Sequence, residues 1–220
     1  MPQWDPERLR AALRLYLLAD TGLAPPERLP DIVAAALRGG FTAVQLRAKT
    51  ATTLELLELA RDLNAMCREA NVPFIVNDRV DVALAAEATG AHVGHIGEED
   101  LSPNDARRLL GPDAIVGVSV ATPQEAHMAT SQGASYVSAG PMFATSTKAN
   151  AGPAAGESLL RSVRAATPLP LVVIGGITAQ RAAALFAAGA DGVCVGAAIV
   201  RAADPEAAAR AFLEPGGAAS

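Results

Sequence analysis

Short apolar runs recur along the chain and alternate with longer stretches of helical periodicity. The stretch with Leu54, Leu57, Ala60 and Leu63 has the spacing of an amphipathic helix, whereas the short runs rich in valine, leucine and isoleucine indicate strands. The runs cover residues 15–19, 43–46, 73–77, 92–96, 114–120, 136–140, 171–175 and 192–196. The pattern therefore predicts alternating strands and helices throughout.

Eight units with nearly continuous apolar strands favour an α/β fold closed into an eight-stranded parallel (β/α)8 TIM barrel. An open doubly wound sheet also fits the alternation and is the alternative. We expect a single domain over residues 1–220, with a leading helix within residues 1–13 and a frayed tail at residues 214–220.

Composition narrows the class of protein. The chain has 220 residues, half of them hydrophobic, and a net charge of -5 without a basic run, which argues against nucleic-acid binding. The first apolar run is too short to span a membrane. Cys67 and Cys194 lack metal-ligand spacing and suggest buried thiols in a reducing compartment. We expect a cytoplasmic protein, and the formation of a homo-oligomer is left open.

Only two lysines, Lys49 and Lys148, occur beside sixteen arginines. Each lysine follows an apolar run, which in a parallel barrel places it at the carboxyl end of a strand, where active sites of this fold lie. A lysine ammonium on a flexible stem can bind a phosphate or form a Schiff base. We favour chemistry over compositional chance for both positions.

Cations and carboxylates follow the second, third and fourth strands. Strand alternation places Gln45, Arg47 and Lys49 on one side, and two adjacent cations favour a phosphate or diphosphate between them. Asp78 and Asp100 follow the next two strands, and such carboxylates beside a diphosphate suit Mg²⁺. Helix capping is the simpler interpretation of Asp81, Glu98 and Glu99.

Hydroxyls and glycines follow the remaining strands. Ser119 ends the fifth, the sixth is followed by a polar loop, and the last two end in small residues whose amides can approach a phosphate. The loop and glycine positions are Thr145, Ser146, Thr147, Lys148, Gly175, Gly176, Gly196 and Ala197. Thr178 is a candidate helix cap. His92, His95 and His127 form no evident triad with Ser119 and receive no primary role.

Taken in order, the strings QLRAK, NDR, GEED, GVSV, GPMFATSTK and GGI resemble the thiamine-phosphate synthase family across nearly the whole chain. The resemblance implies a transferase of thiamine biosynthesis on a (β/α)8 barrel with Mg²⁺ as cofactor. Its expected substrates are a hydroxymethylpyrimidine diphosphate and a thiazole phosphate, and its products are thiamine phosphate and pyrophosphate.

The resemblance also implies roles for individual residues. Asp78 and Asp100 would ligate magnesium, and Arg47, Lys49, Lys148 and Ser119 are the expected catalytic group. The pyrimidine diphosphate would be bound by Gln45, Leu46, Arg47, Ala48, Lys49, Asn77, Ser119 and Lys148. The thiazole phosphate would be bound by Thr145, Ser146, Thr147, Gly176, Gly196 and Ala197.

The chain departs from the family pattern at several points. The usual QLREK reads QLRAK, the usual GQED reads GEED, and the spacing from NDR to GEED is a few residues longer. Gly196 and Ala197 replace a frequent isoleucine-serine pair, so a phosphate-binding hydroxyl is lost and backbone amides take its place.

Three rival functions stay open. A related thiazole tautomerase carries a histidine after the serine-valine pair of the fifth strand, where this chain has Ala121. A Schiff-base aldolase would use one of the lysines. A regulator that binds phosphorylated metabolites would need the pocket without the chemistry.

Overall fold

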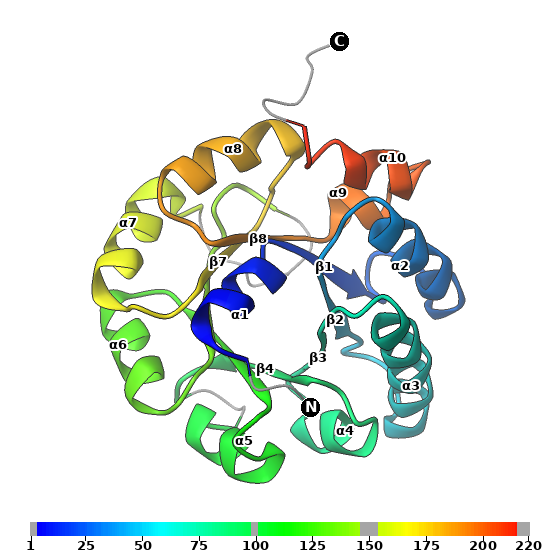
Figure 1. Cartoon of the computed structure of the whole chain (residues 1–220), viewed down its shortest axis with the longest axis horizontal. Helices are drawn as coiled ribbons and strands as arrows, with labels where there is room; N and C mark the ends of the chain where they lie inside the picture. Colours follow the sequence, from blue (N-terminus) through cyan, green and yellow to red (C-terminus); the bar gives the residue numbers. More distant parts are fainter. Residues whose placement is uncertain (1–3, 98–100, 146–153, 215–220) are drawn as a thin grey trace.

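Eight parallel strands form a closed barrel in the computed structural model, which describes residues 4–97, 101–145 and 154–214. Each strand pairs with its sequence neighbour, and β8 pairs with β1 through Leu15 and Val193, so the closed barrel is confirmed and the open sheet is excluded (Figure 1). The strands are β1 (Leu15–Asp20), β2 (Ala43–Arg47), β3 (Phe74–Asn77), β4 (Gly90–His95), β5 (Ile115–Val120), β6 (Tyr136–Ala139), β7 (Leu171–Ile174) and β8 (Gly192–Val195).

Helices surround the barrel as an outer ring (Figure 1). Their bounds are α2 (Leu29–Arg38), α3 (Thr53–Glu69), α4 (Val80–Ala85), α5 (Pro103–Leu110), α6 (Pro123–Ser131), α7 (Gly156–Ala166), α8 (Ala179–Ala187), α9 (Ala197–Val200) and α10 (Pro205–Arg210), with a 3-10 turn at Pro26–Arg28. Helix α1 (Pro6–Ala12) precedes β1, within the stretch expected to hold a leading helix. Residues 215–220 lie outside the described part, so the expected frayed tail is not assessed there.

Strand alternation divides the apolar residues into two cores. Outward-facing side chains such as Leu17 and Leu46 are fully buried against the helices. Inward-facing side chains fill the barrel, and Leu9 and Leu13 from the α1 segment join them together with Trp4. The barrel is therefore closed at its amino-terminal end by α1, and space for a ligand is left at the other end.

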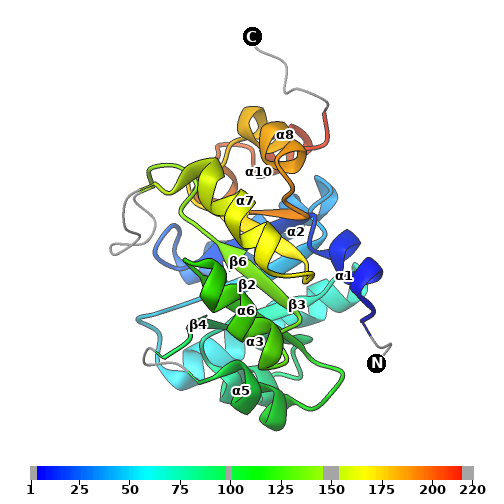
Figure 2. The same cartoon turned by 90° about the vertical axis from the view of Figure 1, so that its left-hand side faces the viewer.

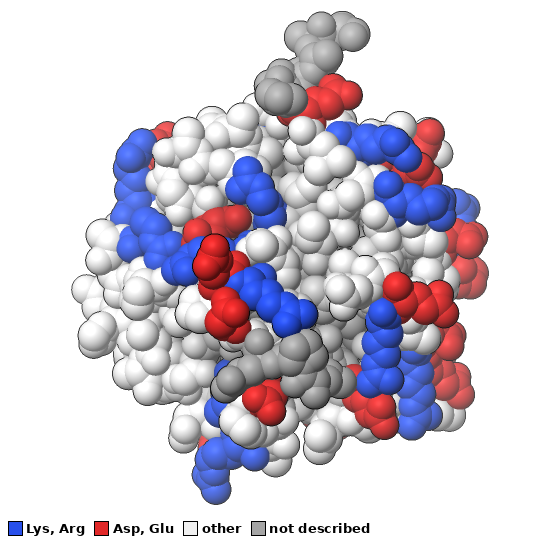
Figure 3. All heavy atoms as spheres, in the orientation of Figure 1, with Lys and Arg blue, Asp and Glu red and all other residues white. Residues whose placement is uncertain are grey.

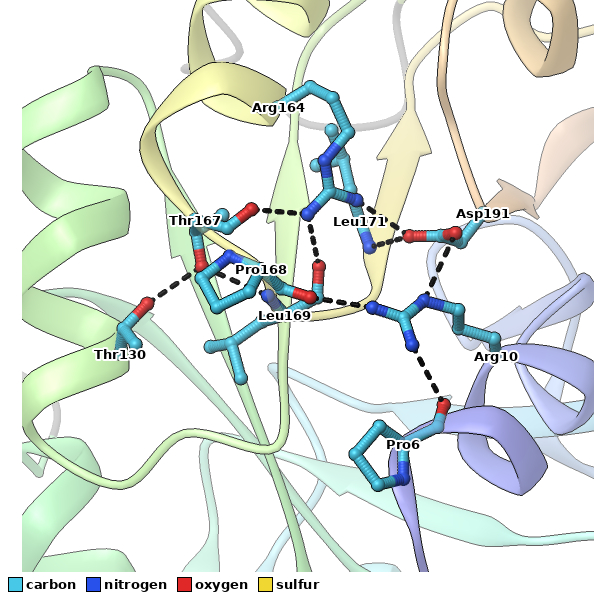
Figure 4. A network of polar contacts seen from close by, with 9 residues as sticks. All are labelled: Pro6, Arg10, Thr130, Arg164, Thr167, Pro168, Leu169, Leu171 and Asp191. Carbon is cyan, nitrogen blue, oxygen red and sulfur yellow. Dashed lines mark hydrogen bonds and ion pairs between the residues drawn. The ribbon is translucent and has the colours of Figure 1, made fainter.

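Helix α1 is held against the amino-terminal end of the barrel by an ion pair between Arg10 and Asp191, which precedes β8 (Figure 4). Arg10 Nε lies 3.3 Å from Asp191 Oδ1, and Arg164 Nη1 and the Leu171 amide each lie 2.8 Å from Asp191 Oδ2. Arg10 also donates to the Pro168 carbonyl at 2.6 Å. Figure 2 shows α1 at one end of the barrel, on the right of the view, and Figure 3 shows basic and acidic side chains intermixed on the face that carries α1.

Strand β4 differs from the expectation, because it begins at Gly90 rather than at His92. Gly90 pairs with Ile75 on one side and Ile115 on the other, and a Cβ at Gly90 would lie 1.8 Å from the Ile115 carbonyl oxygen. The earlier start moves His92 from the beginning of the strand to its middle.

Among the described helices, none combines the length and apolarity needed to cross a membrane.

Candidate functional site

A cavity of about 1030 Å³ opens at the carboxyl ends of the strands and is lined by residues from all eight of them. This is the end at which barrels of this type place their chemistry. Its polar and small lining residues include Tyr16, Asp20, Gln45, Arg47, Lys49, Asn77, Asp78, His92, His95, Ser119, Ser138, Thr145, Gly176, Cys194, Gly196 and Ala197.

The structure brings most of the sequence-predicted site residues into this one cavity. They are Gln45, Arg47, Lys49, Asn77, Asp78, Ser119, Thr145, Gly176, Gly196 and Ala197. Ser146, Thr147, Lys148 and Asp100, together with Glu98 and Glu99, lie outside the described residues. Their proposed places in the site therefore stay predictions.

Two residues of the QLRAK string do not line the cavity. The Leu46 side chain is fully buried in the outer core, and Ala48 packs against the same core. Both alternate with the inward-facing Gln45, Arg47 and Lys49, so strand geometry turns them toward the helices. The cavity lining therefore gives no support to substrate contacts from these two side chains, and their expected roles stay predictions.

Arg47, at the end of β2, and Lys49, two residues further along, each form an ion pair with a carboxylate. Arg47 Nη1 lies 2.8 Å from Oδ2 of the buried Asp20, whose Oδ1 accepts a hydrogen bond from the Gly22 amide at 2.9 Å. Lys49 Nζ forms an ion pair with Asp78 Oδ2. The argument that the two cations require a bound anion is thus corrected, because internal carboxylates neutralise both. Asp20 was missed, although its alternation with Tyr16 and Leu18 indicates that it faces inward.

Asp78 has the properties of a residue placed for a ligand. Its backbone adopts a left-handed conformation, φ 60°, and its amide donates to the His92 carbonyl at 2.7 Å. Oδ2 is buried and, within the described residues, accepts no hydrogen bond and contacts only the Lys49 ammonium as an ion-pair partner. A buried carboxylate oxygen with so few donors suits a divalent cation that binds together with phosphate oxygens.

A chain of hydrogen bonds crosses the floor of the cavity. Gln45 Nε2 donates to the Tyr16 hydroxyl at 2.9 Å, the Tyr16 and Tyr136 hydroxyls lie 2.9 Å apart, and the Tyr136 hydroxyl lies 2.9 Å from His92 Nδ1. His92 Nε2 lies 3.1 Å from Ser119 Oγ. His92 therefore contacts Ser119, although the sequence alone indicated no primary role for it. The Nδ1 partner is a phenol rather than a carboxylate, so the group is not an acid–histidine–serine triad.

Burial keeps the two phenols of the floor and the two cysteine thiols uncharged. It raises the pKa of Tyr16 well above its ordinary value, with a further contribution from Tyr136, and it also raises the pKa of Tyr136. Both phenols therefore stay available as hydrogen-bond donors. Burial raises the pKa of Cys194 as well, and that of Cys67 to about 12, so neither thiol is a ready nucleophile. Both cysteines are free and buried, as expected.

The opposite wall of the cavity is built from small residues. Gly175 and Gly176 have φ values of 103° and 61°, and a Cβ at Gly176 would lie 2.6 Å from the Ala144 carbonyl oxygen. Only glycine allows this conformation beside the loop after β6. Thr178 occupies the N-cap position of α8, but its side chain makes no capping hydrogen bond, so that part of the expectation was wrong.

Comparisons with known proteins agree on one family. A family model described as thiamine monophosphate synthase matches residues 15–199. A thiamine-phosphate synthase of Moorella thermoacetica is 47% identical over 214 residues, which cover 97% of this chain and 96% of the relative. A second, from Roseiflexus castenholzii, is 46% identical over 200 residues and covers 91% and 86% of the two chains.

A solved structure leads to the same family. The thiamine phosphate pyrophosphorylase from Pyrococcus furiosus superposes with a TM-score of 0.83 at 36% sequence identity, covering 93% of this chain and 96% of that one. The similarity extends over nearly the full length of both chains and includes the strands that line the cavity. The chain belongs to the thiamine monophosphate synthase family.

Proposed function

We propose that this protein is a thiamine-phosphate synthase. It joins 4-amino-2-methyl-5-hydroxymethylpyrimidine diphosphate to 4-methyl-5-(2-hydroxyethyl)thiazole phosphate and releases pyrophosphate. With the carboxylated form of the thiazole phosphate as substrate, the carboxyl group is also lost as carbon dioxide. The observation that carries the proposal is the division of one cavity into two walls. Cations and a carboxylate stand on β2 and β3, whereas small residues and a hydroxyl stand on β6, β7 and β8.

The two walls suit the two substrates. Arg47, Lys49 and Asn77 bind the diphosphate, and Lys148 from the loop after β6 joins them. Gln45 and Ser119, joined through the floor network, orient the pyrimidine ring. The amides at Gly176, Gly196 and Ala197, with the hydroxyl of Thr145 and those of Ser146 and Thr147, bind the phosphate of the thiazole.

The reaction begins with cleavage of the bond between the pyrimidine methylene carbon and the diphosphate oxygen. The electron pair leaves with the diphosphate, and the amino group of the ring stabilises the resulting carbocation. The thiazole nitrogen then donates its lone pair to this carbon, and the new carbon–nitrogen bond gives thiamine phosphate. No proton transfer from the protein is required, so fixed positive groups near the leaving diphosphate supply most of the acceleration.

Mg²⁺ fits beside Asp78, because in the described part of the chain the buried Oδ2 of Asp78 accepts no hydrogen bond and has the Lys49 ammonium as its one ion-pair partner. Asp78 and Asp100 would hold the ion. When bound, Mg²⁺ neutralises charge on the diphosphate oxygens. Lys49 leaves its ion pair with Asp78 for the diphosphate in this arrangement, and Asp20 keeps Arg47 in position.

One assay tests the proposed function. The purified protein is incubated with both substrates and Mg²⁺, and thiamine phosphate and pyrophosphate are measured by chromatography. The proposal expects both products in equal amounts, and neither when one substrate is omitted. A rearranged thiazole without pyrophosphate release would favour the tautomerase, and binding of both ligands without turnover would favour the regulator. Trapping of a carbonyl substrate by borohydride would favour the aldolase.

A further inference from the structure

His95 occupies an irregular position at the carboxyl end of β4. Val93 pairs with Val118 and His95 pairs with Ser119, so Gly94 is an extra residue in the ladder between β4 and β5. A β-bulge of this kind re-aims the following side chain and is frequent beside active sites. His95 lines the cavity, with its side chain 25% exposed.

The bulge lies in the stretch where this chain departs from its family. The spacing from the NDR string to the GEED string is longer than usual, and His95 falls between the two. The usual family pattern therefore does not assign a role to this histidine.

Glu125 holds the imidazole in a fixed orientation. Its Oε2 lies 3.0 Å from His95 Nδ1 and accepts the Ala121 amide at 2.8 Å. The backbone amide of Glu125 donates to Thr122 Oγ1 at 3.1 Å, so the carboxylate belongs to the cap of α6. Burial opposes the charge of Glu125, but the hydrogen bonds from Ala121, His95 and Thr122 outweigh it and lower the pKa of Glu125.

An ionised carboxylate accepts a hydrogen bond, so Nδ1 of His95 carries a proton and Nε2 is the nitrogen that is left for a ligand. No group within residues 4–97, 101–145 and 154–214 hydrogen-bonds to Nε2. When both ring nitrogens carry a proton, Nε2 donates to a ligand, and an anionic acceptor in the cavity fits this donor best.

The position of β4 in the barrel indicates which anion this is. β4 stands beside β3, which carries Asn77 and Asp78, and the phosphate wall of β6 to β8 begins on the far side of β5. We propose that His95 binds the diphosphate of the pyrimidine substrate, and the pyrophosphate product, through Nε2. This inference rests on the proposed function for the identity of the substrate.

Binding of inorganic pyrophosphate with Mg²⁺ tests the role of His95 without turnover. Titration calorimetry on the full chain compares the wild type with His95→Asn and with His127→Asn, a control at an exposed histidine of α6. Loss of one charge-assisted hydrogen bond is expected to weaken pyrophosphate binding by about tenfold in His95→Asn. His127→Asn is expected to bind as the wild type does.

Steady-state kinetics separate a diphosphate contact from a merely structural role. In His95→Asn, KM for the pyrimidine diphosphate is expected to rise about tenfold, with KM for the thiazole phosphate unchanged. Glu125→Gln, which keeps the shape of the cap, is expected to shift the same KM in the same direction by a smaller factor. Unchanged pyrophosphate affinity in His95→Asn, or a KM change for the thiazole phosphate alone, would overturn the inference.

An NMR titration of the wild-type protein tests the role of His95 even if the variants do not fold. The protein labelled with ¹⁵N in its three histidines is titrated with pyrophosphate and Mg²⁺, and the His95 Nε2 resonance is expected to shift while that of His127 stays fixed. An unmoved His95 resonance contradicts the inference. If the wild type makes no thiamine phosphate, the proposed function fails, and the pyrophosphate titration still decides the role of His95.

Discussion

Charged residues in this cavity form ion pairs with one another, and a bound substrate has to replace some of these partners. Lys49 is paired with Asp78, and its side chain is 55% exposed, so a diphosphate can reach the ammonium without displacing the core. Arg47 is more enclosed, with a side chain 20% exposed beside the buried Asp20. Lys49 is therefore the cation that can exchange partners, and Arg47 is the one held in place.

Replacement of Lys49 by alanine tests this exchange. We expect Lys49→Ala to lower kcat at least about a hundredfold with both substrates saturating, because one preorganised positive group near the leaving diphosphate is lost. The thermal unfolding midpoint should fall only modestly, because the Lys49 side chain is largely exposed and the one partner lost is that of the buried Asp78 Oδ2. Arg108→Ala removes a cation from the exposed surface of α5 and serves as the control. Wild-type turnover in Lys49→Ala would contradict the assigned role.

Asp78→Asn tests the metal site. The amide keeps the size of the side chain but removes the charge that attracts a divalent ion. We expect the Mg²⁺ concentration for half-maximal activity to rise at least about tenfold, with lower kcat at saturation. The measurement is a Mg²⁺ titration of initial rates, with Asp81→Asn as the matched control on α4. Equal Mg²⁺ dependence in wild type and Asp78→Asn would remove Asp78 from the site.

Ala197→Ser tests the other wall of the cavity. Ala197 is the first residue of α9 and lines the cavity at a position where the family often has a serine. A restored hydroxyl adds one hydrogen bond to the thiazole phosphate, so KM for that substrate should fall about threefold to tenfold. KM for the pyrimidine diphosphate should not change. If instead both KM values move together, Ala197 is not confined to the thiazole side.

At this scale, strand alternation accounts for what could be predicted and for what was missed. Gln45, Arg47 and Lys49 reach the same cavity because residues two apart share one face of a strand. The same rule applied to β1 would have identified Asp20, which was treated only as the end of an apolar run. The pairing of Lys49 with Asp78 was not predictable, because it joins side chains from two strands whose register the sequence does not show.

Glycine residues allow neighbouring strands and side chains of this barrel to approach closely. His92 was expected at the start of its strand, whereas Gly90 and Ala91 already belong to β4 and place it in the middle. The sequence gives no apolar signal for a strand that starts with glycine and alanine. Its start depends on a close approach to β5, which is visible only in three dimensions.

Gly117 of β5 makes room for the floor network, and Gly117→Ala tests the fit. A Cβ at this position would lie 2.1 Å from Tyr136 Cζ, so the ring has to move and its hydroxyl loses contact with His92. We expect the free energy of unfolding to fall by about 1–3 kcal/mol, measured by urea denaturation, together with lower kcat.

Tyr136→Phe provides the comparison for Gly117→Ala, because it removes the same hydroxyl and leaves the ring in place. It should reproduce most of the fall in kcat at a smaller cost in stability. If Gly117→Ala has full activity, the network on the floor of the cavity does not position the substrate.

The two ends of the barrel have different roles. The amino-terminal end, closed by α1, contributes to stability, and the carboxyl end holds the cavity. The barrel itself could be predicted, because eight apolar runs at similar spacing leave few other parallel arrangements. The way its amino-terminal end is closed could not, because Arg10, Arg164 and Asp191 lie far apart in the sequence and show no shared pattern. Asp191 joins α1, α7 and β7 at this end (Figure 4), and it does not line the cavity at the carboxyl ends of the strands.

Asp191→Ala tests whether the amino-terminal end contributes to stability without taking part in catalysis. The change leaves the half-buried Arg164 and the Leu171 amide without their carboxylate, which should lower the free energy of unfolding by about 2–4 kcal/mol. Urea denaturation measures this loss, and Asp31→Ala on the exposed first turn of α2 should cost less than about 1 kcal/mol. Because the cavity lies at the opposite end, kcat and both KM values of the folded variant should match the wild type. Lost turnover at unchanged stability would show that the amino-terminal end also takes part in the chemistry.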